Sequence, residues 1–294
     1  MEKIKNNRVF YHILAITIVM IWGVTFVNSK VLLNAGMRPE EIFLIRFLLA
    51  YVCILFISPR KLFADTWKDE LRMLILGVTG GSVYFLAENM AVKISYVNNV
   101  SFIVCTAPLY TTIMAILFLK NVRATRYIVI GSALALMGMA MVIFNGHFVF
   151  HLSPLGDSLA LTAALCWGVY SLLIKGISER YGSIFITRKV FFYGILTILP
   201  VFIIHPWSFP IASFLEPKIL GNLMFLGLVA SFICFELWSL CINKLGALSV
   251  SNYVYLNPIS TMLASTIFLN EPTSLIAIMG SAMILSGVYL ANKK

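Results

Sequence analysis

IWGVTFVNSK (residues 21–30) and CWGVYSLLIK (residues 166–175) are two copies of one phrase, and the distance between them is about half of the 294-residue chain. Each stretch reads Trp-Gly-Val and reaches a lysine six residues after the valine. Further matches follow in the same order, namely IFLIR (42–46) with IFITR (184–188), APLYTTIMA (107–115) with NPISTMLAS (257–265), and GSALALMG (131–138) with GSAMILSG (280–287). Similarity repeated along the whole chain predicts two structural copies, residues 1–146 and residues 147–294.

The composition is that of a membrane protein. Hydrophobic residues make up 60% of the chain and charged residues only 12%, whereas a soluble domain carries about 25% charged residues. Ten apolar stretches are each about long enough to cross a bilayer as a helix: 10–32, 42–58, 71–92, 97–119, 125–145, 157–176, 184–204, 219–241, 247–269 and 274–292. Since lipid offers no partner to unpaired backbone groups, the stretches must be helical. We therefore expect an all-α integral membrane protein with ten transmembrane helices.

The number of helices in each copy sets their relative orientation. Five is odd, so a second copy that follows the first must enter the membrane from the opposite side. The ten helices are thus expected to form two inverted five-helix repeats, which pack around a site near the membrane midplane. Such a pair can open toward either side in turn, which is the physical basis of alternating access.

The distribution of basic residues predicts the orientation of the chain. When the connections are numbered alternately from the N-terminus, one set holds fifteen Lys and Arg residues and the other holds three. This bias places both termini in the cytoplasm. The net charge of +10 is thereby interpreted as a topology signal, and no nucleic-acid partner is expected. The five cysteines all lie in apolar stretches without a C-x-x-C pair, so no metal site is expected.

One family resemblance is carried by specific residues. The run LGALSVSNYVYLNPISTMLASTIFLNEPTSLIAIMGSAMILSGVYL (245–290), its weaker copy in the first half and the paired Trp-Gly-Val phrases resemble the EamA family of the drug/metabolite transporter superfamily. The resemblance covers nearly the whole chain and implies a transporter of small solutes. The activity that this resemblance implies most often is the export of amino acids or related metabolites.

Six of the charged residues inside the apolar stretches are candidates for gating or proton coupling. They are Lys30, Arg46 and Glu88, expected toward the outer mouth, and Lys175, Arg188 and Glu236, expected toward the inner mouth. A carboxylate inside the membrane is costly and should face a wet cavity or a cation. Our hypothesis is that Glu88 pairs with Arg46 or Lys30 when the outer mouth is closed, and Glu236 with Arg188 or Lys175 when the inner mouth is closed. Two alternatives stay open: the basic residues reach lipid headgroups, or one glutamate takes up a proton.

A second set of residues is expected to line a central cavity. Pro108 and Pro258 lie mid-span in equivalent helices, where each would free a backbone carbonyl four residues earlier, at Val104 and Val254. Polar and aromatic residues lie near these prolines or near the repeated phrase. The candidate cavity residues are Trp22, Tyr84, Ser101, Cys105, Pro108, Thr112, Trp167, Tyr170, Asn252, Tyr255, Asn257 and Pro258. The alternative interpretation is structural: kinks whose backbone is satisfied by Thr and Asn, and tryptophans that only pack.

These features favour a secondary transporter over other classes of membrane protein. We expect an exporter of small metabolites, such as amino acids or amphiphilic and aromatic compounds, in the plasma (inner) membrane. An intramembrane enzyme or a channel with a midplane cavity is the alternative. The sequence lacks H-E-x-x-H, G-x-S-x-G and nucleotide-binding loops, so we expect neither an enzyme nor a cofactor. The expected partners are a small-molecule solute and the lipid bilayer, and proton coupling and a homodimer both stay open.

Overall fold

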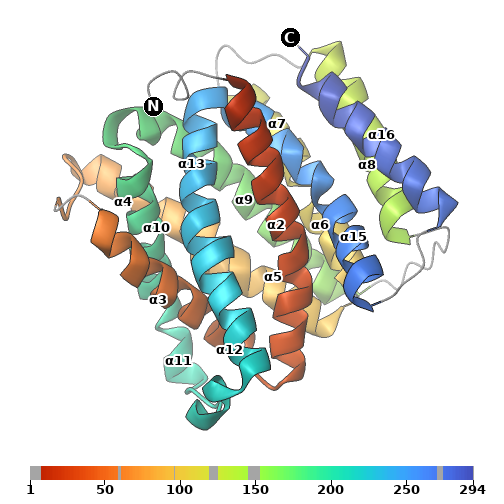
Figure 1. Ribbon diagram of the computed structural model, residues 1–294. Coiled ribbons are helices and arrows are strands. Elements are labelled where there is room, and N and C mark those ends of the chain that lie inside the picture. The colour runs from red at the N-terminus through yellow and green to blue at the C-terminus, as the bar shows by residue number, and fades with distance from the viewer. Residues whose placement is uncertain are drawn as a thin grey trace.

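The computed structural model describes residues 8–58, 61–95, 97–118, 125–144, 153–269 and 274–293. All regular secondary structure within these ranges is helical, and they contain no strand. The helices form one bundle, and the start of α2 and the end of α16 lie at the same end of it (Figure 1). For the described residues, the prediction of an all-α protein is therefore confirmed.

The first half of the bundle runs from α2 to α8 and the second from α9 to α16. In the first half the helices are α2 (Arg8–Asn34), α3 (Pro39–Ile57), α4 (Trp67–Gly77), the π-helical η1 (Val78–Ser82), α5 (Val83–Ile94), α6 (Val97–Val104), α7 (Ala107–Phe118) and α8 (Arg126–Phe144). In the second half they are α9 (Pro154–Tyr181), α10 (Ser183–Ile198), α11 (Val201–Ile204), the 3₁₀ turn η2 (Ile211–Leu215), α12 (Pro217–Met224), the π-helical η3 (Phe225–Ile233), α13 (Cys234–Leu245), α14 (Ala247–Ser251), the 3₁₀ turn η4 (Asn252–Leu256), α15 (Asn257–Leu269) and α16 (Leu275–Ala291).

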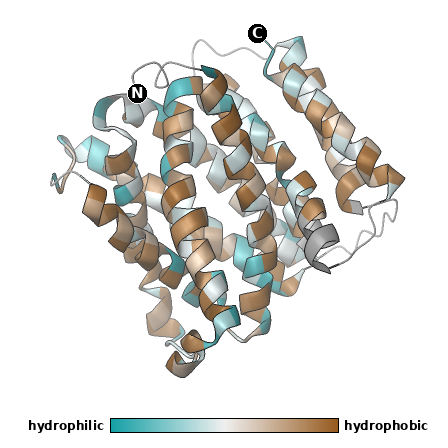
Figure 2. Cartoon of the chain, in the orientation of Figure 1, coloured by the Kyte–Doolittle hydropathy of each residue, from teal (hydrophilic) through white to brown (hydrophobic). Residues whose placement is uncertain are grey.

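Seven helical stretches among the described residues are long and apolar enough to cross a membrane. They are Arg8–Asn34, Trp67–Ile94, Val100–Phe118, Arg126–Ile143, Pro154–Ser178, Ser183–Ile204 and Pro217–Leu245. Helix α3 is 19 residues long but carries Glu40, Glu41 and Arg46, and α16 is apolar but has only 17 residues. Large apolar side chains such as Phe56 and Ile203 project from the outside of the bundle. Figure 2 shows hydrophobic residues along the helices and hydrophilic ones mostly toward their ends, as expected for a surface solvated by lipid.

The repeated Trp-Gly phrases are contact points between helices. A Cβ atom added to Gly23 of α2 would lie 2.7 Å from the Asn257 backbone oxygen of α15. A Cβ atom added to Gly168 of α9 would lie 3.3 Å from the Thr111 backbone nitrogen of α7. At Gly23 only glycine permits so close an approach, whereas at Gly168 a Cβ atom would crowd α7 without excluding it. The phrase thus occurs twice because α2 and α9 each use it to pack against a helix of the opposite half.

Small residues also hold α8 against α16, which stand side by side at one edge of the bundle (Figure 1). A Cβ on Gly138 would approach the Gly280 carbonyl oxygen to 2.5 Å, and one on Gly287 would approach the Ala135 nitrogen to 2.5 Å. The GSALALMG and GSAMILSG stretches thus form a packing surface of the kind that small residues provide between membrane helices.

Both prolines mark the start of a new helix, which refines the prediction of a mid-span kink. Pro108 is the second residue of α7, after a break at residues 105–106, and Pro258 is the second residue of α15, after the 3₁₀ turn η4. Proline is well tolerated in the first helical turn, because its missing N–H would be unpaired there in any case. The two breaks lie beside the centre of the bundle and bring Val104 and Val254 to the wall of a cavity.

Candidate functional site

A narrow cavity lies near the centre of the bundle, between its two halves. It encloses about 40 Å³ of free space, so it is nearly closed in this conformation and would have to widen to hold a small molecule. The lining comes from helices of both halves: Trp22, Thr25, Phe26, Arg46, Tyr84, Phe85, Glu88, Val104, Ala107, Trp167, Phe235, Val254 and Asn257. The wall is mostly aromatic and aliphatic, with an arginine, a glutamate and an asparagine among its polar groups.

Aromatic rings from both halves meet at the cavity. Trp22 and Trp167, the tryptophans of the repeated phrase, lie edge to face with ring centroids 5.2 Å apart. Trp22 also lies 4.9 Å from the Trp238 ring, and Trp167 lies 5.1 Å from the Tyr84 ring. Edge-to-face and tilted pairs at this spacing are favourable for aromatic rings. The Trp22 indole N–H donates to the Ala230 carbonyl at 2.9 Å, within the π-helical segment η3, which holds the ring in place.

Arg46 places a positive charge in the wall of the cavity. Its side chain comes from α3 and is only 2% exposed. The Nε–H donates to the Ser231 hydroxyl of η3 at 2.9 Å, and the guanidinium carbon lies 4.1 Å from the Phe85 ring centroid. The hydrogen bond and the cation–π contact keep the planar guanidinium at a defined orientation.

Glu88 places a negative charge in the same wall. The residue is 5% exposed, interacts electrostatically with Arg46, and has the Tyr84 hydroxyl beside its carboxylate. Its Oε2 atom is buried and has no hydrogen-bond partner among the described residues, as is the case for Oδ1 of Asn257. Buried polar atoms are nearly always paired, so unpaired ones at a cavity indicate a place for a ligand or for water.

The other predicted cavity residues lie around this centre without lining it. Cys105 is buried and its Sγ accepts a hydrogen bond from Asn257 at 3.7 Å. The rest are buried, or half-buried in the case of Thr112: Ser101, Pro108, Thr112, Tyr170, Asn252, Tyr255 and Pro258. Of the twelve predicted cavity residues, the lining includes Trp22, Tyr84, Trp167 and Asn257.

The predicted gating residues differ in their surroundings. Lys30 donates to the Val92 carbonyl at 3.1 Å, and Lys175 donates to the Asn243 carbonyl at 3.1 Å. These two lysines of the repeated phrase thus bind helix ends in the two halves in the same manner. Glu236 accepts a hydrogen bond from the Ser183 hydroxyl, and Arg188 donates to the Lys61 carbonyl. The pairing of glutamates with these cations in a closed mouth stays a prediction.

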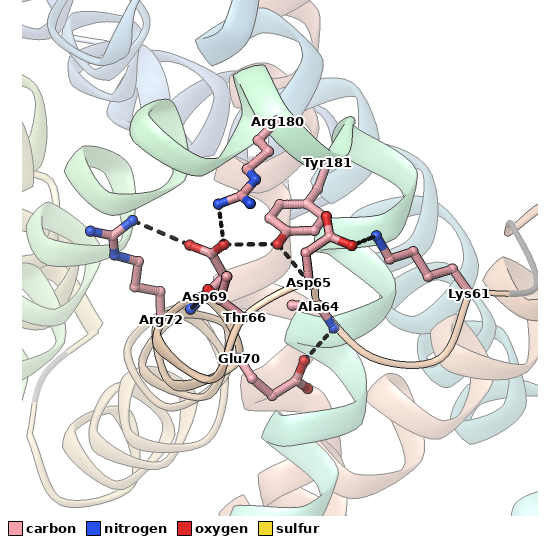
Figure 3. A network of polar contacts seen from close by, with 9 residues as sticks. All are labelled: Lys61, Ala64, Asp65, Thr66, Asp69, Glu70, Arg72, Arg180 and Tyr181. Carbon is pink, nitrogen blue, oxygen red and sulfur yellow. Dashed lines mark hydrogen bonds and ion pairs between the residues drawn. The ribbon is translucent and has the colours of Figure 1, made fainter.

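Sequence reasoning missed a polar network at the end of the bundle that holds the α9–α10 corner (Figure 3). We call it the α4 network; it joins the start of α4 and the loop before it to α9 and comprises Lys61, Ala64, Asp65, Thr66, Asp69, Glu70, Arg72, Arg180 and Tyr181. Asp69 accepts hydrogen bonds from Arg180 at 2.6 Å and from Tyr181 at 2.8 Å. The hydrogen bond from Lys61 lowers the pKa of Asp65. The network therefore ties the two halves together at this end.

The α4 network continues into a buried ion pair. Lys189 of α10 is 3% exposed and binds the Glu70 carboxylate, which also accepts a hydrogen bond from Tyr193. The Ala64 N–H donates to Oε2 of Glu70 at 2.6 Å. The signal that could have revealed this pair was Lys189 directly after Arg188 in an apolar stretch, because two adjacent cations at membrane depth require partners.

A second polar cluster closes the opposite end of the bundle, where α2 meets α3. Glu41 is fully buried and accepts hydrogen bonds from the Ser208 N–H at 2.7 Å and the Phe209 N–H at 3.1 Å. Its Oε2 accepts from the Arg38 N–H at 2.8 Å, which caps α3. The loop before α12 is thus fastened over the start of α3. Across the described residues, no group of three or more His, Cys, Asp or Glu side chains could hold a metal ion.

Comparison with known proteins identifies the family. The model of the EamA-like transporter family matches the chain twice, over residues 9–144 and residues 154–293. The chain belongs to the EamA-like transporter family. The resemblance noted in the sequence is thereby confirmed, as is the expectation of a membrane transporter.

Relatives of this EamA-like chain cover between about three quarters and nearly all of its length. A protein of Archaeoglobus fulgidus named an uncharacterized transporter is 23% identical over 96% of this chain and 97% of its own. A probable amino-acid metabolite efflux pump of Escherichia coli is 24% identical over 95% and 93%. A probable terminal-alkyne amino-acid exporter of Streptantibioticus cattleyicolor is 26% identical over 77% and 74%. A protein crystal structure covering 97% of this chain and 96% of its own has a TM-score of 0.77 at 17% identity, and so shares the fold.

Proposed function

We propose that this EamA-like chain is a secondary transporter that exports small metabolites, such as amino acids or amphiphilic and aromatic compounds, across the plasma (inner) membrane by alternating access. The observation that carries the proposal is the central cavity, which combines an aromatic wall from both halves of the bundle with the opposite charges of Arg46 and Glu88. The names of two relatives, an amino-acid metabolite efflux pump and an amino-acid exporter, support the substrate class.

The proposal includes ten membrane-spanning helices arranged as two inverted repeats, residues 1–146 and 147–294. Two matches to one family model support this division. The helix pairs support it as well, because each contact recurs with the halves exchanged. Helix α2 packs on α13 and α15 as α9 packs on α5 and α7, and α3 packs on η3 as α10 packs on η1. Such reciprocal packing is what a two-fold axis in the membrane plane produces.

Alternating access requires a closure on each side of the cavity that can be opened. The α4 network supplies connections of this kind at one end of the bundle, and the cluster around Glu41 supplies them at the other. Both join segments that are far apart in the chain, and in each a buried carboxylate has an arginine partner that is partly exposed to water, Arg180 for Asp69 and Arg38 for Glu41. Their rupture in turn would open the cavity to one side and then to the other.

Flux measurements on the purified full-length chain test the function. In proteoliposomes loaded with unlabelled L-phenylalanine, we expect saturable counterflow of labelled L-phenylalanine above that of protein-free vesicles. Vesicles with an imposed pH gradient report proton coupling in the same preparation. Flux that does not saturate would instead indicate a channel, and chemical conversion of the solute would indicate an enzyme. Absence of flux for amino acids and for aromatic amines alike would contradict the proposal.

The proposed orientation places both termini in the cytoplasm and predicts which loops a reagent can reach. In a cysteine-free background, Ala212→Cys is expected to react with a membrane-impermeant maleimide on intact cells, since residue 212 lies in the loop before α12. Leu62→Cys lies at the other end and is expected to react only after the membrane is permeabilised. Both side chains are well exposed to solvent, so accessibility within the fold does not limit either reaction. Equal labelling of the two positions on intact cells would rule out this topology.

A further inference from the structure

The cavity holds one cation and one anion beside an aromatic wall, and this combination has a chemical complement. We propose that it binds an α-amino acid as a zwitterion, with the carboxylate on Arg46, the ammonium group on Glu88, and an apolar or aromatic side chain against Trp22, Trp167 and Phe235. The inference rests on the proposed function, because the same cavity would be the transport site. It adds the two specificity-determining residues and the charge state of the substrate.

Arg46 is built to receive a carboxylate. A guanidinium has five N–H donors in a planar fork that matches the two oxygens of a carboxylate. The donor on Nε binds Ser231, and the described part of the chain supplies no further hydrogen bond to the two Nη groups. The face of the guanidinium is covered by Phe85, so a ligand approaches the edge of the fork, where the Nη donors lie. The Ser231 bond prevents the fork from turning away from the cavity.

Glu88 is built to receive a cation. Its Oε2 atom is buried without a partner and its neighbour Asn257 presents a second unpaired oxygen, Oδ1, at the same cavity. A primary ammonium group has three N–H donors and no acceptor. It can therefore satisfy both oxygens at once, whereas a second carboxylate would be repelled. The Tyr84 hydroxyl beside Glu88 helps to keep its carboxylate at the wall.

The charges of the site favour a ligand with two opposite poles. Without a ligand, Arg46 and Glu88 compensate each other electrostatically across the cavity. A ligand with only one charge would displace one partner and leave the other buried and uncompensated, which is strongly unfavourable. A zwitterion replaces both partners and keeps the cavity neutral. The rings of Trp22, Trp167 and Phe235, with centroids 5.2–5.9 Å apart, form the surface that remains for its side chain.

A panel of ligand analogues tests the inference on the unmodified protein. The full-length chain in nanodiscs is titrated with L-phenylalanine, with phenethylamine, which lacks the carboxylate, and with N-acetyl-L-phenylalanine, which lacks the ammonium group. Quenching of the fluorescence of the cavity tryptophans measures binding. We expect both analogues to bind about 10- to 100-fold more weakly than L-phenylalanine, as for loss of a hydrogen-bonded charged group. Equal binding of the three compounds would overturn the inference.

Two variants test which residue binds the carboxylate and which binds the ammonium group of the ligand. Arg46→Gln is expected to weaken L-phenylalanine binding about 10- to 100-fold while leaving phenethylamine unchanged, and Glu88→Gln to weaken L-phenylalanine while leaving N-acetyl-L-phenylalanine unchanged. Arg46→Lys, which keeps the charge but not the fork, is expected to bind with intermediate affinity. Lys93→Gln and Glu216→Gln remove exposed charges of the same kind and serve as controls. A uniform loss of affinity for all ligands in a folded variant would assign that residue a structural role. It would contradict its assignment as the partner of the carboxylate or of the ammonium group.

The outcomes separate this inference from the proposed function. Suppose that Arg46→Gln and the wild type both show saturable L-phenylalanine flux with the same preference among the analogues. This result would support the transporter function and contradict the assignment of Arg46 to the ligand carboxylate. The expected binding pattern without flux in proteoliposomes would keep the amino-acid site and remove the transporter. If Glu88 serves only as a proton carrier, Glu88→Gln will abolish the effect of a pH gradient on flux but keep the discrimination against N-acetyl-L-phenylalanine, which also contradicts the inference.

Discussion

Replacing Lys189 by methionine is expected to lower the free energy of unfolding by about 3–5 kcal/mol. Lys189 and Glu70 form an ion pair between α10 and α4, and both residues are less than 10% exposed. Methionine has a similar shape but no charge, so the substitution leaves Glu70 buried with hydrogen bonds from Tyr193 and Ala64 only. The penalty arises from this uncompensated carboxylate more than from the lost attraction. Equilibrium unfolding of the purified protein in mixed micelles measures the difference.

The matched variants distinguish a buried pair from a general need for positive charge. Lys68→Met removes an exposed lysine two residues before Glu70 on α4 and is expected to change stability by less than about 0.5 kcal/mol. The double variant Lys189→Met with Glu70→Gln removes both charges and is expected to recover a large part of the loss, because no buried charge then remains. If the single and double variants are equally unstable, the ion pair is not the source of the effect.

Replacing Trp22 by alanine is expected to cost about 3–5 kcal/mol and to abolish amino-acid flux. The indole contacts Trp167, Phe235 and Trp238, with centroids 4.9–5.8 Å away, and donates to the Ala230 carbonyl. Truncation to alanine therefore removes part of the cavity wall and the hydrogen-bond donor to the π-helical segment η3. Thermal unfolding and L-phenylalanine counterflow measure the two consequences separately.

Conservative and distant tryptophan variants serve as controls for this prediction. Trp22→Phe keeps an aromatic ring but loses the N–H, so we expect an intermediate loss of stability and measurable flux. Trp67, at the start of α4, is 81% exposed, and Trp67→Ala is expected to leave both stability and flux near the wild-type values. Full flux in Trp22→Ala would mean that the solute does not pass between the two tryptophans.

The polar clusters at the two ends of the bundle differ in how they are built. The α4 network joins side chains of α4 to side chains of α9, including Asp69 with Arg180. The cluster around Glu41 instead joins one carboxylate to backbone N–H groups of the loop before α12. Side-chain pairs at a surface are individually weak and screened by salt, whereas a buried carboxylate held by backbone donors is not. In the proposed alternating-access cycle, opening of the end that carries the α4 network is therefore expected to be the more sensitive to ionic strength.

The sequence by itself determined the membrane-helical character of the protein and the family to which it belongs. Runs of about 20 apolar residues can be satisfied in lipid only as helices, so composition was enough. The matched stretches, which occur in the same order in both halves of the chain, also predicted two structural copies. Four predicted residues that line the cavity, Trp22, Tyr84, Trp167 and Asn257, came from the same reasoning.

Only the tertiary structure decided which buried charges meet. Arg46 and Glu88 reach one cavity because α3 and α5 both turn these residues toward the second half, and Lys189 finds Glu70 across 119 positions of the chain. Local sequence determines helix formation and burial in lipid, because these depend on residues within one or two turns. The pairing of distant side chains depends instead on how whole helices cross and rotate, and this is set jointly by small residues such as Gly77, Gly80 and Gly194 and the rings packed against them. No single stretch of sequence contains that information.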